Sequence, residues 1–192
     1  MTTTQAIRRR DRWADWAVVA LVAVALILGQ VTREVTLSRT APFTVANAGI
    51  RVQYPAAWMR ESGDDPLLRV RDARGGKFDT TLELRSRPLA AEAKPVMALD
   101  ALALERAGQV VAYQALSTDQ VLVGGEITTR RTFAYVHADR NPYVDRLPVV
   151  VQGTDLALRD GDRTIIVTFL ADADNFDAHY RYFRAFLESM EF

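Results

Sequence analysis

The chain has 192 residues, 24 basic and 24 acidic, so its formal net charge is zero. Hydrophobic residues make up 49% of it and charged residues 25%, which is typical of a folded protein rather than a disordered one. It has no cysteine, which excludes disulfides, cysteine nucleophiles, iron–sulfur clusters, cysteine zinc sites and a lipid-modified cysteine anchor.

Positive charge is concentrated near the N-terminus. Six arginines and three acidic residues precede residue 42, whereas the rest of the chain has 18 basic and 21 acidic residues. A weakly acidic domain is a poor electrostatic match for nucleic acid, which calls for a basic surface. The composition therefore predicts no nucleic-acid partner.

A long apolar run follows the first arginines. Residues 16–28 read WAVVALVAVALIL, and the nineteen residues from Trp13 to Val31 would span about 28 Å as a helix, close to the ~30 Å hydrocarbon core. The run predicts a cytoplasmic segment at 1–12, one transmembrane helix at 13–31 and a linker at 32–42. Interfacial tryptophans, small residues and leucines are expected to form the anchor: Trp13, Trp16, Ala17, Ala20, Leu21, Ala23 and Leu28.

The flanking charges predict the orientation of this helix. Four arginines precede it, and only Arg33 and Arg39 follow it closely, so the positive-inside rule leaves the N-terminus in the cytoplasm. The remaining domain would lie on the periplasmic or extracytoplasmic side of the inner membrane. A cleaved signal peptide is the alternative, but the sequence GQVTREVTLS has no pair of small residues at the −3 and −1 positions that cleavage requires. A buried helix of a soluble protein fits less well, because the segment is apolar on every face.

The rest of the chain alternates between strand and helix patterns. Turn residues at 47–49 and 74–77 each join two strand-like segments into a predicted hairpin. The alternation of Leu82 and Leu84 with Glu83 and Arg85 indicates a sheet with one wet face. Helical spacing appears over Pro95–Ala107 and Asp174–Met190. The predicted strands are 43–46, 50–54, 67–72, 80–85, 110–117, 126–138, 149–158 and 164–170. Residues 43–192 should therefore form an α+β domain in which two helices cover a mainly antiparallel sheet, an α/β/α sandwich.

Three segments resemble domains of the Mog1/PsbP-like fold. Residues 48–58, AGIRVQYPAAW, are similar to the opening strand of such domains, residues 161–171 to a strand pair, and residues 183–192, FRAFLESMEF, to the final helix. The resemblance covers Phe43 to Phe192. It implies a binding or assembly module, since the fold includes extrinsic photosystem subunits, a small-GTPase-binding nuclear protein and exported bacterial proteins. It brings no catalytic residues.

The residue patterns predict no enzyme, metal or cofactor. Nothing in their spacing brings His137 and His179 together, and no serine-nucleophile motif occurs. The acidic segment Asp172–Asp177 lacks the glycine of a calcium loop and is better explained as a helix cap. Arg74–Lys77 is followed by a strand, which favours a hairpin turn over a phosphate loop.

Two places are candidates for contact with a partner. The loop ADRNPYVDRL at 138–147 offers Arg140, Pro142 and Tyr143, and Trp58 is the second candidate, although a buried role fits Trp58 equally well. Our hypothesis is a non-catalytic, membrane-anchored accessory subunit that braces the extracytoplasmic face of an integral membrane complex, with a respiratory or photosynthetic electron-transfer complex as one host. The alternative is a membrane-tethered ligand-binding or envelope-stress module, which predicts a pocket between helix and sheet.

Overall fold

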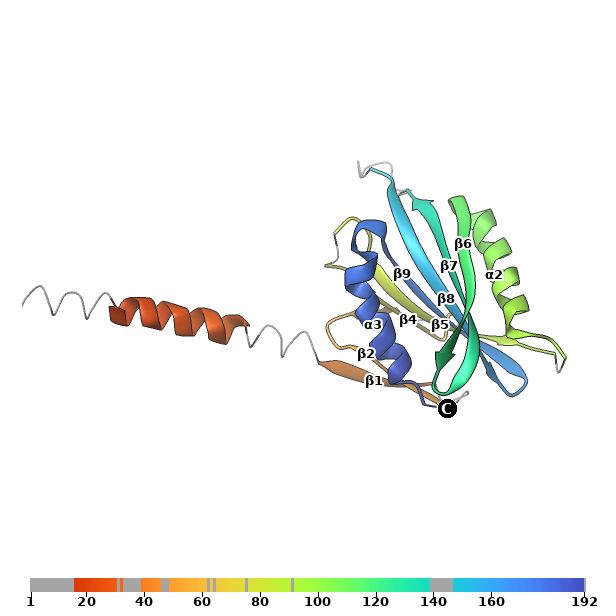
Figure 1. Ribbon diagram of the computed structural model, residues 1–192, viewed down its shortest axis with the longest axis horizontal. Helices are drawn as coiled ribbons and strands as arrows, with labels where there is room; N and C mark the ends of the chain where they lie inside the picture. Colours follow the sequence, from red (N-terminus) through yellow and green to blue (C-terminus); the bar gives the residue numbers. More distant parts are fainter. Residues whose placement is uncertain are drawn as a thin grey trace, which may run out of the picture. The chain divides into compact units, whose positions relative to one another are not determined.

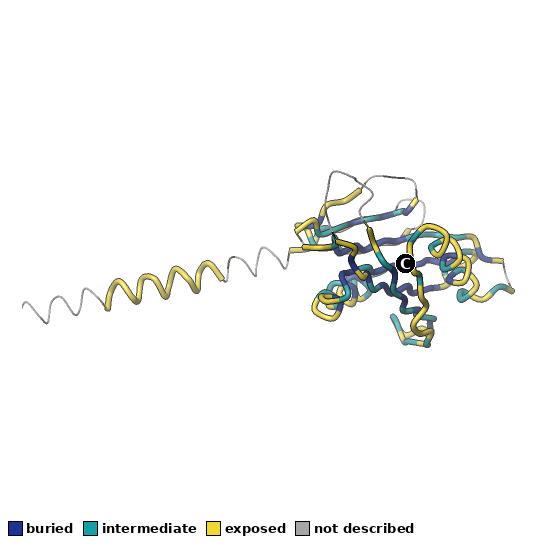
Figure 2. Tube along the Cα trace, turned by 90° about the horizontal axis from the view of Figure 1, so that it is seen from above, coloured by how far each residue is buried: buried dark blue, intermediate teal, exposed yellow. Residues whose placement is uncertain are grey.

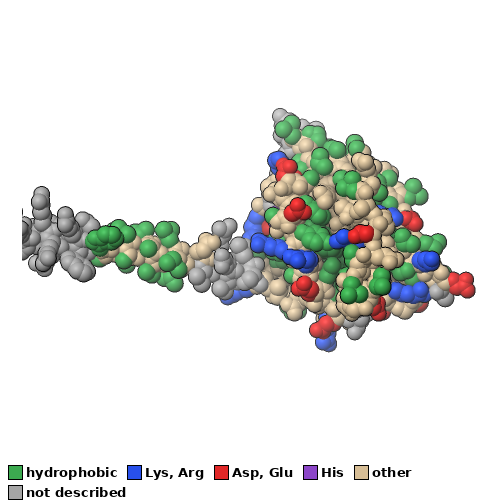
Figure 3. Space-filling model, in the orientation of Figure 1, with side chains coloured by type: hydrophobic (Ala, Val, Ile, Leu, Met, Phe, Trp, Pro, Cys, Tyr) green, Lys and Arg blue, Asp and Glu red, His purple; other side chains and the backbone are tan. Residues whose placement is uncertain are grey.

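The computed structural model describes residues 16–30, 32, 39–45, 49–61, 63, 65–74, 76–90, 92–138 and 147–191. The chain divides into two compact units, Met1–Arg39 and Thr40–Phe192. In the first unit residues 16–30 are helical and exposed throughout, and apolar side chains follow the helix (Figures 2 and 3). Among the described residues, no helix has the length and hydropathy needed to cross a bilayer. Trp13 and Val31, the ends of the predicted span, lie outside these residues.

Seven antiparallel strands form the main sheet of the second unit, in the order β3-β4-β5-β9-β8-β7-β6 (Figure 1). A separate hairpin pairs β1 with β2. The strands are β1 Thr40–Val45, β2 Ile50–Pro55, β3 Met59–Glu61, β4 Leu68–Asp72, β5 Thr80–Pro88, β6 Val111–Val123, β7 Glu126–His137, β8 Val149–Asp160 and β9 Arg163–Asp172. The tight turn between β8 and β9 has Gly161 at φ +59°, a conformation that glycine adopts without strain.

Two α-helices and one short 3₁₀ turn accompany the sheet: α2 Pro95–Gln109, η1 Ala173–Asn175 and α3 Phe176–Glu188. Pro95 begins α2, as the sequence predicts, but the helix continues through Gly108 to Gln109. The Asp172 carboxylate accepts a hydrogen bond from the Asp174 backbone N–H at 3.1 Å and so caps η1. The capping interpretation of the acidic segment therefore holds for η1, whereas α3 itself has Asn175 at its N-cap and no side-chain hydrogen bond there.

The helices pack on opposite faces of the sheet because successive side chains of a strand point to opposite sides. Val167 and Phe169 of β9 belong to the apolar core that also contains Phe183 of α3. Their neighbour Ile166 packs instead with Leu99 and Leu102 of α2. The predicted α+β class and antiparallel sheet are confirmed, and the buried strands of the sheet are visible in Figure 2.

The differences from the sequence prediction include three that concern β1, β3 and β6. β1 begins at Thr40, inside the segment assigned to the linker. β3 was not predicted, because three residues are too few for a recognisable alternation. β6 continues from Ser117 to Val123, since Thr118, Asp119 and Gln120 lie on an edge strand whose side chains remain largely exposed.

Candidate functional site

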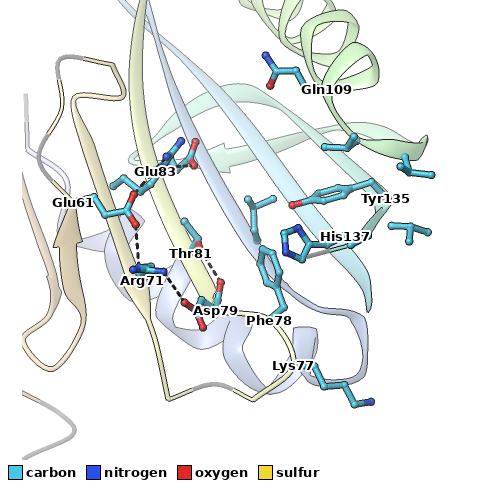
Figure 4. Close-up of a pocket in the computed structure, with 16 residues that line it drawn as sticks. Glu61, Arg71, Lys77, Phe78, Asp79, Thr81, Glu83, Gln109, Tyr135 and His137 are labelled. Atoms are coloured by element: carbon cyan, nitrogen blue, oxygen red, sulfur yellow. Dashed lines mark hydrogen bonds and ion pairs between the residues drawn. The ribbon is translucent and has the colours of Figure 1, made fainter. Parts of the chain in front are cut away.

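A cleft of about 830 Å³ opens on the face of the sheet that carries α2. Helix α2 packs over β6, β7, β8 and β9, so strands β3, β4 and β5 extend beyond it. The cleft lies between these strands and the end of α2, and its walls include Gln109 and Val110 as well as Tyr135 and His137 of β7 (Figure 4).

One wall of the cleft carries charges of alternating sign. Glu61 lies 3.5 Å from Arg69 and 3.0 Å from Arg71, and Arg71 lies 3.0 Å from Asp79 (Figure 4). Strand register produces this arrangement, because Arg69 of β4 stands opposite both Glu61 of β3 and Glu83 of β5. The pairs of Arg69 with Glu61 and of Arg71 with Asp79 are partly exposed and add little stability, but they fix the positions of the charges.

The opposite wall is aromatic and apolar. Phe78 and His137 meet edge to face with ring centroids 5.2 Å apart, and Tyr135 lies beside them (Figure 4). Leu170 of β9 and Val110 after α2 extend this wall. A ligand in the cleft would therefore contact ionic groups on one side and ring surface on the other.

A smaller chamber of about 150 Å³ continues from the cleft toward the last turns of α2. Its central group is Glu83, whose side chain is only 7% exposed. The Arg69 Nε–H donates to Glu83 Oε1 at 2.7 Å, and Arg85 donates to Oε2 through Nε at 3.2 Å and Nη2 at 3.1 Å. Arg106 also lines the chamber.

Arg106 is held by a second buried carboxylate. It donates to both oxygens of Asp155, at 2.6 and 3.2 Å, and Asp155 has no exposed side-chain surface. The Thr168 hydroxyl donates to the same carboxylate at 2.6 Å. The Arg106 guanidinium also lies 4.1 Å from the centre of the Phe133 ring, which adds a cation–π contact.

Gly153 makes room for the Phe133 ring. It stands opposite Phe133 in the β7–β8 register, and a Cβ at this position would lie 2.3 Å from Phe133 Cζ and 2.8 Å from Leu170 Cδ2. Neither ring nor leucine could remain where it is at those distances. The glycine therefore allows the ring to lie flat beneath Arg106.

Burial perturbs the titrating groups around the chamber. Burial would lower the pKa of Arg106, but its attraction to Asp155 outweighs this and raises the pKa, so the guanidinium stays charged. Burial raises the pKa of Tyr135 to about 12, and it also raises the pKa of Tyr113. Both phenols are neutral at physiological pH and can donate hydrogen bonds.

The side chains of the cleft and chamber are groups that recognise a ligand: guanidinium donors, carboxylate acceptors, phenols and ring faces. Across the described residues, no group of three His, Cys, Asp or Glu side chains could hold a metal ion. The arrangement supports binding through paired charges and aromatic contact.

The structure changes the role of one predicted contact residue. Trp58 is 5% exposed, and its ring meets that of Tyr182 edge to face at 5.4 Å. It is a core residue, so the hypothesis that it contacts a partner is wrong and the buried alternative holds. Arg140, Pro142 and Tyr143 lie outside the described residues. The described anchor residues are on the exposed helix over residues 16–30: Trp16, Ala17, Ala20, Leu21, Ala23 and Leu28.

The two histidines have separate surroundings. His179 is on α3, and its Nδ1 lies 2.7 Å from the Thr80 hydroxyl oxygen. His137 ends β7 and packs on Phe78 at the cleft. Sequence reasoning did not identify His137 as part of a cleft, because its contact with Phe78 joins two segments that are far apart in the sequence.

No protein-family model matches the sequence, and no curated protein matches it. Solved structures do match. Cyanobacterial PsbP from Synechocystis aligns with a TM-score of 0.57 and 10% identity, over 79% of this chain and 91% of that one. The chain has the Mog1/PsbP-like fold.

Two further structures agree. The Ran-binding protein Mog1p from Saccharomyces cerevisiae has a TM-score of 0.53 and 10% identity, with 80% of this chain and 95% of Mog1p covered. LpqN of Mycobacterium tuberculosis, which is involved in cell envelope biogenesis, has a TM-score of 0.51 and 12% identity, with 79% and 89% covered. At these identities the Mog1/PsbP-like likeness concerns the fold alone.

Proposed function

We propose that this chain is a non-catalytic accessory protein of a larger membrane complex. Its N-terminal helix would anchor it in the inner membrane with the N-terminus in the cytoplasm. Its Mog1/PsbP-like domain would bind the extracytoplasmic face of the complex through the cleft beside α2. The observation that carries this proposal is the cleft itself, with an ordered ionic wall facing an aromatic one.

The composition of the cleft suits a protein partner. Arginine and tyrosine are enriched where proteins meet, and a few such residues usually dominate the binding energy. Arg69 and Arg71 are fixed by carboxylates, so they are pre-organised and lose little side-chain freedom on binding. The alternating charges would set the register of the partner, while Phe78 and Tyr135 provide apolar contact area.

The N-terminal helix supports attachment to a membrane. Trp16, Leu21 and Leu28 are 71%, 72% and 61% exposed, and an apolar helix with no cover is costly in water. Lipid and the helices of an integral membrane protein are the surroundings that would cover it. Ala17, Ala20 and Ala23 would permit close approach of another helix. The neighbours PsbP and LpqN motivate, by analogy, a photosynthetic or respiratory host or an envelope role.

The second candidate is a membrane-tethered ligand-binding or envelope-stress module. The chamber between α2 and the sheet favours it, because several polar groups converge there on a small volume. This function predicts a small-molecule ligand that raises the melting temperature of the domain, and no stoichiometric protein partner.

Site-specific cross-linking in native membranes tests the leading function. A photo-reactive amino acid would replace Lys77, whose side chain is 67% exposed at the cleft, or as a matched control Arg184, which is exposed on α3. The expected result is a cross-link to one membrane protein from position 77 and not from position 184, with that protein present in equal amount in the purified complex. A chain that purifies as a monomer without cross-links would contradict the proposal.

A further inference from the structure

One edge of the main sheet is formed by the long strand β6, which pairs only with β7 among the described residues (Figure 1). We propose that residues 117–123 of β6 pair antiparallel with the same residues of a second copy of the chain, about a two-fold axis at Gln120, so that the two sheets become one. These residues lie away from the cleft, to which β6 contributes Val111. The dimer therefore does not depend on the proposed function.

The two edges of the sheet differ in their protection against further pairing. The opposite edge strand, β3, has only three residues. The first half of β6 is interrupted, because its register against β7 shifts between Val111 and Gln114 and again between Ala115 and Ser117. Short strands and bulges are common means of protecting an edge. From residue 117 to residue 123 the register is continuous, and this stretch contains neither proline nor lysine.

Alternate residues of this stretch direct their backbone groups outward. Gly124 and Gly125 form a two-residue turn with φ at +60° and +89°, so Val123 and Glu126 are a hydrogen-bonded pair. Every second residue back from Val123 then bonds to β7. The residues between them turn their N–H and C=O groups away from β7: Thr118, Gln120 and Leu122. Such a row of groups is a template onto which another strand can add.

The regular stretch and its charge select one register for a second copy. Gln120 is the midpoint of residues 117–123, so an axis at Gln120 uses all seven, and any other axis shortens the paired stretch or brings in the bulge. An axis at Asp119 would also set two like charges directly opposite each other. About Gln120, Asp119 faces Val121 of the second copy. Asp119 is the only charge in the stretch, and Arg130 of its own copy donates to it at 3.2 Å.

The side chains that would meet across the axis suit each other. The Gln120 amide is both a donor and an acceptor, so two copies of it can hydrogen-bond to one another. Leu122 and its cross-strand neighbour Ile127 are 70% and 73% exposed, and Leu122 would pack beside Thr118 of the second copy. The joint would add about six backbone hydrogen bonds. A second copy therefore covers outward backbone groups and exposed apolar side chains together.

Helix α2 leaves room for the joint. Its 15 residues span about 22 Å and run back along β6 from Val110. Its first turn consequently lies level with the start of the paired stretch, where Pro95 and Val96 line a groove with Thr118 and Gln120. Because the two copies run in opposite directions, their α2 helices lie at opposite ends of the joint and do not meet.

Disulfide trapping tests the inference, since the chain has no cysteine of its own. Full-length chains in detergent would carry one new cysteine each. Gln120→Cys should give a disulfide-linked dimer on mild oxidation, because residues directly opposite in an antiparallel pair have Cα atoms about 5.5 Å apart, within disulfide range. Leu104→Cys, at a side chain 78% exposed on α2, is the matched control and should remain monomeric.

Mixed oxidation tests the register. Thr118→Cys and Leu122→Cys should each fail to link to themselves, because the two cysteines would lie about 13 Å apart along the strands. A mixture of the two variants, distinguished by affinity tags, should give the mixed dimer. The inference is overturned if Gln120→Cys links no more than Leu104→Cys does, or if Thr118→Cys links to itself as readily as to Leu122→Cys.

A lysine at the axis tests the dimer without a covalent bond. Gln120→Lys would place two like charges directly opposite each other, so the dissociation constant measured by sedimentation in detergent should rise several-fold. Leu104→Lys should leave it unchanged, and circular dichroism should show the same fold in both variants. Equal dissociation constants in the two variants would mean that another surface, such as the N-terminal helix, holds the dimer, and would overturn the inference.

Discussion

The two faces of the main sheet bury different chemistry. On the α3 face, Phe169 packs with Phe176 and Phe183, with ring centroids 5.3 and 5.6 Å away. On the α2 face, the best-buried contacts include Arg106 with Asp155 and Arg85 with Glu83. Neighbouring residues of one strand contribute to the two faces: on β5, Leu82 lies in the core under α3 and Glu83 lies on the α2 side. The comparison separates a face that stabilises the domain from a face that presents recognition groups.

The difference has an energetic meaning. Packed aromatic side chains contribute directly to stability, whereas a buried ion pair often contributes no more than apolar residues of the same volume. Buried charges that are retained beside an open cleft, at no evident gain in stability, are candidates for binding. Breaking each face separately should reveal the two roles.

The largest effect is expected from the α3 face. Replacing Phe183 by alanine in the full chain should lower the free energy of unfolding by about 4 kcal/mol, because a completely buried ring leaves a cavity. Urea unfolding in detergent would measure this, with Trp58 as the buried reporter within the domain. Leu104→Ala, at a side chain 78% exposed on α2, should change it by less than about 0.5 kcal/mol. Similar losses in Phe183→Ala and Leu104→Ala would refute the assignment of the α3 face as the one that stabilises the domain.

A slightly smaller effect is expected from the ionic face. Arg106→Met should cost about 3 kcal/mol, since it leaves the Asp155 carboxylate buried without its cation. Adding Asp155→Leu should restore most of this loss, because the unpaired charge is removed. The same urea titrations measure both variants. A double variant no more stable than the single one would mean that the ion pair itself stabilises the domain.

Alkaline pH should produce the smallest effect. The pKa of Tyr135 rises from its ordinary 10.0 to about 12 in the fold. Above pH 10 the unfolded chain releases a proton that the folded chain retains, so stability falls from pH 10 to pH 12, by about 2–3 kcal/mol for two pKa units. Tyr135→Phe should lose less stability over this range, as measured by the urea midpoint at each pH. Equal losses of stability in the wild type and in Tyr135→Phe would mean that the raised pKa belongs to another group.

The sequence predicts most of the fold and little of the site. Alternation at Leu82 and Leu84, the turn at Gly161 and the spacing of Phe176, Tyr180 and Phe183 are local patterns, and each corresponds to an observed element. The helix predicted from Pro95 ends at Ala107, before Gly108, whereas α2 continues through Gly108 to Gln109.

The cleft could not be predicted from local patterns. Glu83 and Arg85 fit the wet side of a strand, and only the packing of α2 and the pairing of β4 with β5 turn that side into a chamber wall. Arg106 and Asp155 are 49 positions apart in the sequence. Asp155 gives a local sign of the ion pair. It lies in the run 153–158, which is buried throughout, and a buried carboxylate requires a partner.

The central claim is that a partner binds the cleft on the α2 face. Its most direct test is recovery of the membrane complex with the full chain carrying Arg71→Glu, which places three acids together at the cleft mouth, compared with Arg184→Glu on α3. We predict that Arg71→Glu reduces recovery about tenfold, since like charges at an interface cost more than 1 kcal/mol, while circular dichroism shows an unchanged fold. Equal recovery of the complex by the two variants would contradict the account.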